Sequence, residues 1–118
     1  MSEVELYIMR FSPEVQRRLL DIRRIGFDVF SDAEEKIYHG VPRFMINGKD
    51  IMNYGAYKDH ITLYVGYAMK DFLSGIYPQC RYTKSAIHFP HGEYLSGEMI
   101  REICELLNST RQRLRGES

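Results

Sequence analysis

The sequence has no tryptophan, only two cysteines, no net charge and no long apolar segment. No run of residues approaches the ~18–20 apolar residues that a membrane-spanning helix needs. Residues 1–10 include Glu3 and Glu5 and contain no apolar centre, so they do not predict a signal peptide. We therefore expect a cytoplasmic protein that does not associate with membranes.

An excess of positive charge is also absent. The chain has 16 Lys and Arg residues against 16 Asp and Glu residues. Proteins that bind nucleic acids mainly through phosphate contacts carry a basic excess, so we do not expect a nucleic-acid partner. The common catalytic motifs are missing too: there is no glycine-rich phosphate loop, no Gly-x-Ser-x-Gly and no His-Glu-x-x-His. The sequence predicts no catalytic residue and favours a non-enzymatic protein.

The two cysteines, Cys80 and Cys104, form neither a Cys-x-x-Cys motif nor a spacing typical of metal ligands. We expect two free thiols in a reducing compartment. Cys104 lies on or beside the apolar face of a predicted helix, an unfavourable place for a reactive thiolate.

What is present is ordinary for a globular domain. The 118 residues are 44% hydrophobic and 27% charged, and a chain of this length forms one domain. The sequence predicts a single domain over residues 1–118, with an ordered core from about residue 7 to residue 114.

Two helices are predicted in the first third of the chain. Ser12 and Pro13 are typical of a helix start, an apolar stripe with helical spacing follows, and Gly26 is expected to end this helix. A second, short helix is predicted from Ser31, because Ser31 and Glu34 have the spacing of a capping box. Gly40 is expected to end it.

Strands are predicted next. Residues 43–46 and 51–57 flank Asn47-Gly48, the strongest short signal for a β-hairpin. Gly55 within the second strand suggests a bulge or a close backbone approach. Residues 60–65 alternate and form a third strand. Short connections make these three strands an antiparallel meander.

The remaining elements are a helix over residues 67–74, a loop, a strand over residues 85–89 and a long helix from Ser96 to about Leu114. The predicted fold class is α+β: an antiparallel sheet, formed by the three-strand meander plus a later strand, with helices packed on one face.

Five segments in this order resemble the YdhG-like family of small bacterial domains of unknown function. They are residues 33–44, the Asn-Gly-Lys turn at 47–49, residues 57–64, residues 84–90 and the closing helix. The resemblance extends from about Tyr7 to Leu114. It implies a frataxin-like fold, and some members of that family have been proposed as iron chaperones for iron–sulfur cluster assembly. The implied cargo is Fe(II), and the implied partner is an iron–sulfur scaffold protein.

Two groups of acidic residues are the candidate metal ligands, because Fe(II) accepts carboxylate ligands. Glu98, Glu102 and Glu105 share one face of the last predicted helix. Asp32, Glu34 and Glu35 lie at the start of the short predicted helix. The structural alternative is that both groups are solvated helix surfaces or charges that complement a helix dipole.

A small-ligand pocket is the alternative function. Aromatic walls with a few polar groups are typical of such sites, and His60 and Lys84 are the groups expected to meet an anionic ligand. The candidate residues come from the segments of the resemblance and are Tyr38, Pro42, Phe44, Tyr57, His60, Tyr64, Lys84 and Phe89. Ordinary packing against a sheet explains these residues equally well. An uncovered aromatic sheet face would also favour a homodimer.

Overall fold

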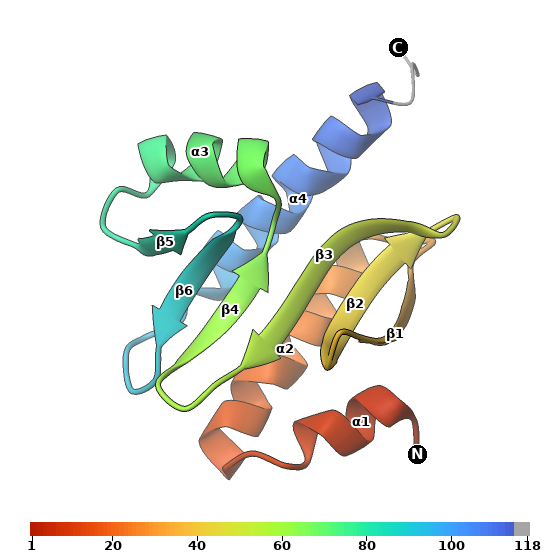
Figure 1. The fold of residues 1–118 in the computed structure, drawn as a ribbon, viewed down its shortest axis with the longest axis vertical. Helices are drawn as coiled ribbons and strands as arrows, with labels where there is room; N and C mark the ends of the chain where they lie inside the picture. The colour runs from red at the N-terminus through yellow and green to blue at the C-terminus, as the bar shows by residue number, and fades with distance from the viewer. Residues whose placement is uncertain (115–118) are drawn as a thin grey trace.

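A computed structural model describes residues 1–114 of the chain, which form one sheet and four helices (Figure 1). The helices are α1 (Glu3–Ile8), α2 (Pro13–Val29), α3 (Tyr67–Ile76) and α4 (Gly97–Leu114). The strands are β1 (Glu34–Tyr38), β2 (Val41–Ile46), β3 (Lys49–Ala56), β4 (His60–Tyr64), β5 (Arg81–Thr83) and β6 (Ala86–Pro90). Within these residues no helix is both long and apolar enough to cross a membrane.

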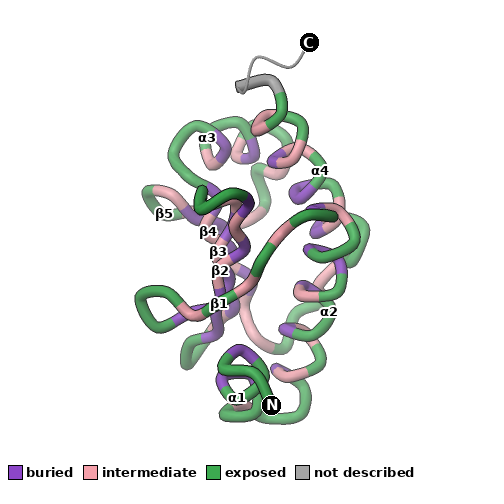
Figure 2. The backbone as a smooth tube through the Cα atoms, turned by 90° about the vertical axis from the view of Figure 1, so that its right-hand side faces the viewer, coloured by how far each residue is buried: buried purple, intermediate pink, exposed green. Residues whose placement is uncertain are grey.

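The six strands form one antiparallel sheet in the order β1-β2-β3-β4-β6-β5. The first four strands are a continuous meander, and the hairpin of β5 and β6 adds to it through β6. Helices α2 and α4 lie side by side along one face of this sheet (Figure 2). Helices α1 and α3 lie toward opposite ends of the strands (Figure 1). The predicted α+β class is therefore confirmed.

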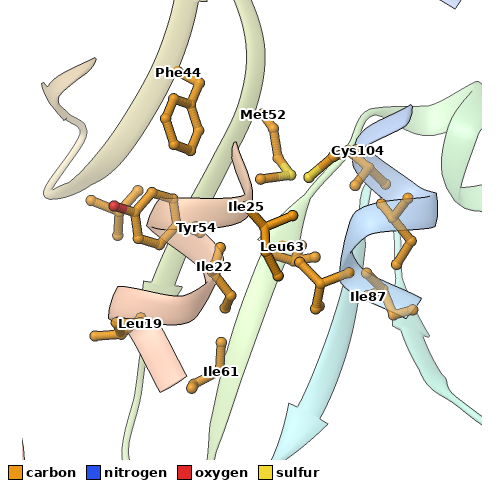
Figure 3. Packing of buried hydrophobic residues seen from close by; sticks show 14 of the residues in the cluster. Leu19, Ile22, Ile25, Phe44, Met52, Tyr54, Ile61, Leu63, Ile87 and Cys104 are labelled. Carbon is orange, nitrogen blue, oxygen red and sulfur yellow. The ribbon is translucent and has the colours of Figure 1, made fainter. Parts of the chain in front are cut away.

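The core lies between the sheet and the pair α2 and α4. Leu19 and Ile22 of α2 are fully buried and lie near Ile61 and Leu63 of β4 (Figure 3). Cys104 of α4 is also fully buried in this layer. Each large aliphatic side chain buried here contributes about 1.5–3 kcal/mol to the hydrophobic stabilisation of the fold.

Helix α2 begins as the sequence predicted but does not end at Gly26. The Ser12 side chain accepts a hydrogen bond from the Val15 backbone N–H, and Pro13 is the first helical residue. Gly26 lies inside the helix, where a Cβ atom would stand 2.5 Å from the Phe44 ring. This glycine is required for the close approach of α2 to β2 and is not a stop signal.

The short helix predicted from Ser31 is wrong, because residues 34–38 form the edge strand β1. Its side chains alternate between exposed and half-buried, and it pairs with β2 along its whole length. Pairing with β2 and burial of alternate side chains outweigh the local capping signal. The outer edge is partly capped, because the Ile37 backbone N–H donates to Glu3 Oε1 of α1 at 2.8 Å.

The predicted hairpin at Asn47-Gly48 is confirmed. Both residues have positive φ values, 53° and 76°, as a type I′ turn requires. At Gly55 the close neighbour is a side chain and not another backbone, since a Cβ atom there would stand 2.7 Å from Val41 Cγ1. The register irregularity between β2 and β3 lies at Phe44 and Met45 instead.

Two elements are absent from the prediction. Residues 81–83, expected to be loop, form β5. Helix α1 brings buried Val4 into the core, so the ordered part begins before residue 7.

The hydroxyl of Tyr7 accepts a hydrogen bond from the Ala56 backbone N–H at 3.0 Å, at the end of β3. At the other end, α4 reaches Leu114 as expected.

Candidate functional site

The face of the sheet opposite α2 and α4 carries a cluster of histidine, tyrosine and threonine side chains. Ile61 and Leu63 of β4 point into the core, so the alternating residues between and beside them point the other way. The strand register extends this face to the neighbouring strands. The residues Tyr57, His60, Thr62, Tyr64, Thr83 and His88 together are here called the His–Tyr cluster.

His88 occupies the middle of the cluster and has a hydroxyl partner at each ring nitrogen. Thr62 Oγ1 lies 2.9 Å from Nδ1, and Thr83 Oγ1 lies 2.7 Å from Nε2. Burial, together with the nearby His60, lowers the pKa of His88. The ring is therefore held in its neutral form at neutral pH, with one nitrogen donating and the other accepting.

His60 links this histidine to a pair of tyrosines. Its ring lies edge-on to His88 at 4.9 Å between centroids and 5.4 Å from the Tyr57 ring. The hydroxyls of Tyr57 and Tyr64 are 2.5 Å apart. Burial and this hydrogen bond raise the pKa of Tyr57 to about 12, so the phenol stays protonated at neutral pH.

A depression of about 390 Å³ opens beside the two histidines. It is lined by Asp59, His60, Arg81, Tyr82, Thr83, His88 and Pro90. This volume lies within the range of small-ligand sites, ~300–1,000 Å³. Its walls offer imidazole and hydroxyl groups for hydrogen bonds, a guanidinium and a carboxylate at the rim, and no activated nucleophile.

Seven of the eight residues of the predicted pocket are divided between the two faces of the sheet. Tyr38, His60 and Tyr64 lie on the open face, and the Tyr57 hydroxyl reaches that of Tyr64. Tyr38 is not brought to the cluster, because it lies on the edge strand β1, where its ring contacts Arg43 and His39. Pro42, Phe44 and Phe89 are buried on the side of the helices. Phe44 packs against Phe27 and Phe30 and stacks on Tyr54. These buried residues are structural, because strand alternation sends neighbouring residues to opposite faces.

Lys84 does not join His60. His60 pairs with Pro90 at one end of β6, whereas Lys84 precedes Ala86 at the other end. The four residue steps from Ala86 to Pro90 alone span about 13 Å along a strand. Lys84 Nζ instead lies 5.4 Å from the centre of the Tyr67 ring.

The candidate metal ligands do not converge. Glu34 and Glu35 lie on a strand, not a helix, and therefore point to opposite faces. Glu35 is almost fully buried and pairs with Arg23 at 2.7 Å and with the Tyr54 hydroxyl at 2.5 Å. Asp32 precedes the strand and is exposed.

On α4, Glu98, Glu102 and Glu105 are exposed, and Glu102 accepts a hydrogen bond from the Tyr77 hydroxyl. Among residues 1–114 whose side chains are described, no three His, Cys, Asp or Glu residues lie together in a way that would hold a metal ion.

Both cysteines are free thiols, as predicted. Burial raises the pKa of Cys80, and it raises the pKa of Cys104 to about 12. Neither environment produces the thiolate that nucleophilic catalysis uses.

Thr62, Thr83 and His88 were not among the predicted pocket residues. His88 stood in a matched segment, but its role depends on two threonines from two different strands. The alternation of β4 was available in the sequence, whereas the pairing of β6 with β4 and β5 was not.

The comparisons with known proteins establish the fold. The chain is similar to a crystal structure of a DUF1801-family protein, YdhG, from Bacillus subtilis, with a TM-score of 0.79 and 14% sequence identity. That match covers 92% of this chain and 90% of the other. An uncharacterised conserved protein from Lactobacillus casei matches with a TM-score of 0.59 and 18% identity, over 99% of this chain and 96% of the other. The sequence matches no family model and no curated protein.

Proposed function

We propose that this protein is a non-enzymatic, cytoplasmic member of the YdhG-like family that binds a small polar ligand at the His–Tyr cluster. The observation that carries the proposal is the hydrogen-bonded set of imidazole, phenol and threonine groups beside an open depression. The likeness to a DUF1801-family structure supports the same fold, and the five matched segments support the family.

The chemistry of the cluster favours recognition over catalysis. His88 is neutral and already holds two hydroxyl partners, and one of the Tyr57 and Tyr64 hydroxyls donates a hydrogen bond to the other. Groups in such a network are held in fixed orientations, which suits selective hydrogen bonding to a ligand. The His60 ring is half-buried beside the depression and is the group best placed to contact a bound molecule.

The iron-carrier hypothesis is the second candidate, and it rests on the resemblance. Weak Fe(II) binding would require carboxylates close together. The α4 carboxylates are exposed on one helix face, whereas Glu35 is already paired with Arg23. An iron–sulfur scaffold partner belongs to this hypothesis alone.

A two-part titration separates the candidates. A library of small organic acids, amides and alcohols is added to ¹⁵N-labelled protein, and amide shifts are mapped. We expect a bound compound to shift residues of β4, β5 and β6, and to lose affinity in His60→Ala. The matched control is His39→Asn, on the exposed turn between β1 and β2, which should leave the affinity unchanged.

The second part is an anaerobic Fe(II) titration with Mg(II) as the control ion. The variant replaces Asp32, Glu34, Glu35, Glu98, Glu102 and Glu105 by their amides. We expect equal, weak binding by both proteins. Fe(II) binding that disappears in the variant, with no compound bound at β4–β6, would overturn the ligand proposal in favour of iron.

A further inference from the structure

A cavity of about 730 Å³ lies away from the His–Tyr cluster, between α3, the C-terminal half of α4 and the start of β3. It shares none of the cluster's residues. Its lining is mostly apolar: Ile51, Val65, Tyr67, Ala68, Met69, Phe72, Leu106 and Leu107, together with Asp50, Gly66, Ser109, Thr110 and Arg111. This cavity is called the α3–α4 groove below.

The apolar wall of the α3–α4 groove is unusually open to solvent. Tyr67 and Phe72 are 58% and 55% exposed, although both belong to the short helix α3. Met69 and Leu107 at the base are buried. Large exposed apolar groups lining a groove are typical of a surface that binds another apolar group.

Arg111 lies beside these apolar residues, and its guanidinium lacks a full set of hydrogen-bond partners. Arg111 Nη2 donates to Asn108 Oδ1 at 2.9 Å. Its Nε and Nη1 atoms are shielded from solvent and have no hydrogen-bond partner. A guanidinium removed from water without an acceptor is costly, and a carboxylate is the acceptor that matches its geometry best.

The acidic residue that also lines the groove does not neutralise Arg111. Asp50 Oδ1 lies 3.2 Å from Arg43 Nε on the neighbouring strand β2. Asp50 is therefore paired with Arg43, and Arg111 is the cation without an ionic partner among the described residues that line the groove. Lys84, which lies over the outer Tyr67 ring, is not one of the lining residues.

We propose that the α3–α4 groove binds an apolar monocarboxylate, a molecule with a hydrocarbon body and a single carboxylate such as a medium-chain fatty acid. The hydrocarbon lies against Tyr67, Phe72 and Leu106. The carboxylate accepts hydrogen bonds from the Arg111 guanidinium, whose Nε and Nη1 atoms have no other acceptor among the described residues.

The test uses decanoate, kept below its micelle concentration, and decan-1-ol, which has the same chain and no charge. ¹⁵N-resolved titrations of the full chain should give saturable binding of decanoate, with amide shifts concentrated in residues 65–72 and 106–111. Decan-1-ol should bind at the same place at least tenfold more weakly.

Arg111→Met should weaken decanoate binding at least tenfold and leave decan-1-ol binding unchanged. Arg17→Met, which removes an equal charge from the exposed surface of α2, should change neither. Phe72→Ser should weaken both ligands, and because Phe72 is largely exposed this variant keeps the fold. Circular dichroism checks each variant.

Three outcomes would overturn the proposal: no binding of decanoate, shifts centred on another part of the molecule, or equal affinity of decanoate for the wild type and for Arg111→Met. None of these outcomes bears on the ligand proposal for the His–Tyr cluster, because that proposal is tested with different compounds and a different variant.

Discussion

At the scale of single residues, the most consequential polar group inside the molecule is Glu35. Its side chain is 3% exposed and accepts from Arg23 and from the Tyr54 hydroxyl. Arg23 comes from α2, Glu35 from β1 and Tyr54 from β3, so this network holds the edge strand to the helix layer. Removing one partner of a buried ion pair is costly, because it leaves the other charge buried without compensation.

Glu35→Gln should lower the free energy of unfolding by about 1–3 kcal/mol, because the charge-assisted hydrogen bonds to Arg23 and Tyr54 are lost. Urea denaturation followed by circular dichroism measures this value. The adjacent Glu34→Gln is the control, since that side chain is exposed on the opposite face, and it should change the value by less than about 0.5 kcal/mol. Equal effects of the two substitutions would contradict the strand assignment of this segment.

His88 should make the stability of the protein depend on pH. Its pKa is lowered in the folded state by burial and by His60, so the unfolded chain binds the proton more readily. Stability is therefore full above the unfolded pKa of ~6.5 and falls as the pH drops from there toward the lowered, folded-state pKa.

Unfolding free energies measured between pH 7.5 and pH 5 should show this loss. In His88→Gln the loss should be smaller, whereas in His39→Asn, on an exposed turn, it should match that of the wild type. A His88→Gln protein with the full pH dependence would show that other groups cause it.

At the scale of elements, the contact between α2 and β2 depends on one glycine. A Cβ atom at Gly26 would stand 2.5 Å from Phe44, whose ring is fully buried and packed against Phe27, Phe30 and Tyr54. The surface of α2 at Gly26 is therefore complementary in shape to the Phe44 ring of β2.

Gly26→Ala should destabilise the protein by about 1–3 kcal/mol, the usual cost of overpacking a core, although alanine normally favours a helix. Gly75→Ala in α3 is the matched control. A Cβ atom there meets nothing within 4 Å, so the protein should gain up to about 1 kcal/mol. Thermal unfolding of both variants provides the comparison, and a stabilised Gly26→Ala would show that Phe44 moves freely.

At the scale of the whole molecule, the two thiols differ in when a reagent can reach them. Cys80 is reachable in the native protein, whereas Cys104 becomes reachable when the protein opens. Cys80 is half-buried, whereas Cys104 is fully buried between α4 and the sheet (Figure 3). Burial also raises the pKa of Cys104 to about 12. A reagent reaches this thiol only when the helix layer separates from the sheet.

In native protein a thiol reagent should therefore modify Cys80 and leave Cys104 unreacted. In the Cys80→Ser variant, the exposure of Cys104 with increasing guanidinium should follow the same midpoint as the loss of helical circular dichroism, as expected for two-state unfolding. Rapid reaction of Cys104 without denaturant would indicate an opening of the α4 layer below the global transition.

The sequence by itself determined the elements with strong local signals. The start of α2 at Ser12-Pro13, the Asn47-Gly48 hairpin, the alternation of β4 and the long last helix all follow from capping, turn geometry and periodicity, which act between residues close in the chain. These signals were sufficient for the α+β class and for the antiparallel meander of β2, β3 and β4. Tyr57, His60 and Tyr64 also came from the sequence as members of one group.

Only the tertiary structure decided what depends on partners distant in the chain. Residues 34–38 form a strand because β2 offers an edge to pair with, despite a local helix-capping signal. Phe44 and Phe89 belong to the core, and His88 belongs to the cluster, because pairing between strands fixes which alternate residues face the helices. The cavity beside Arg111 likewise requires α3, α4 and β3 to meet. Such contacts depend on packing between segments tens of residues apart, and no local pattern encodes them.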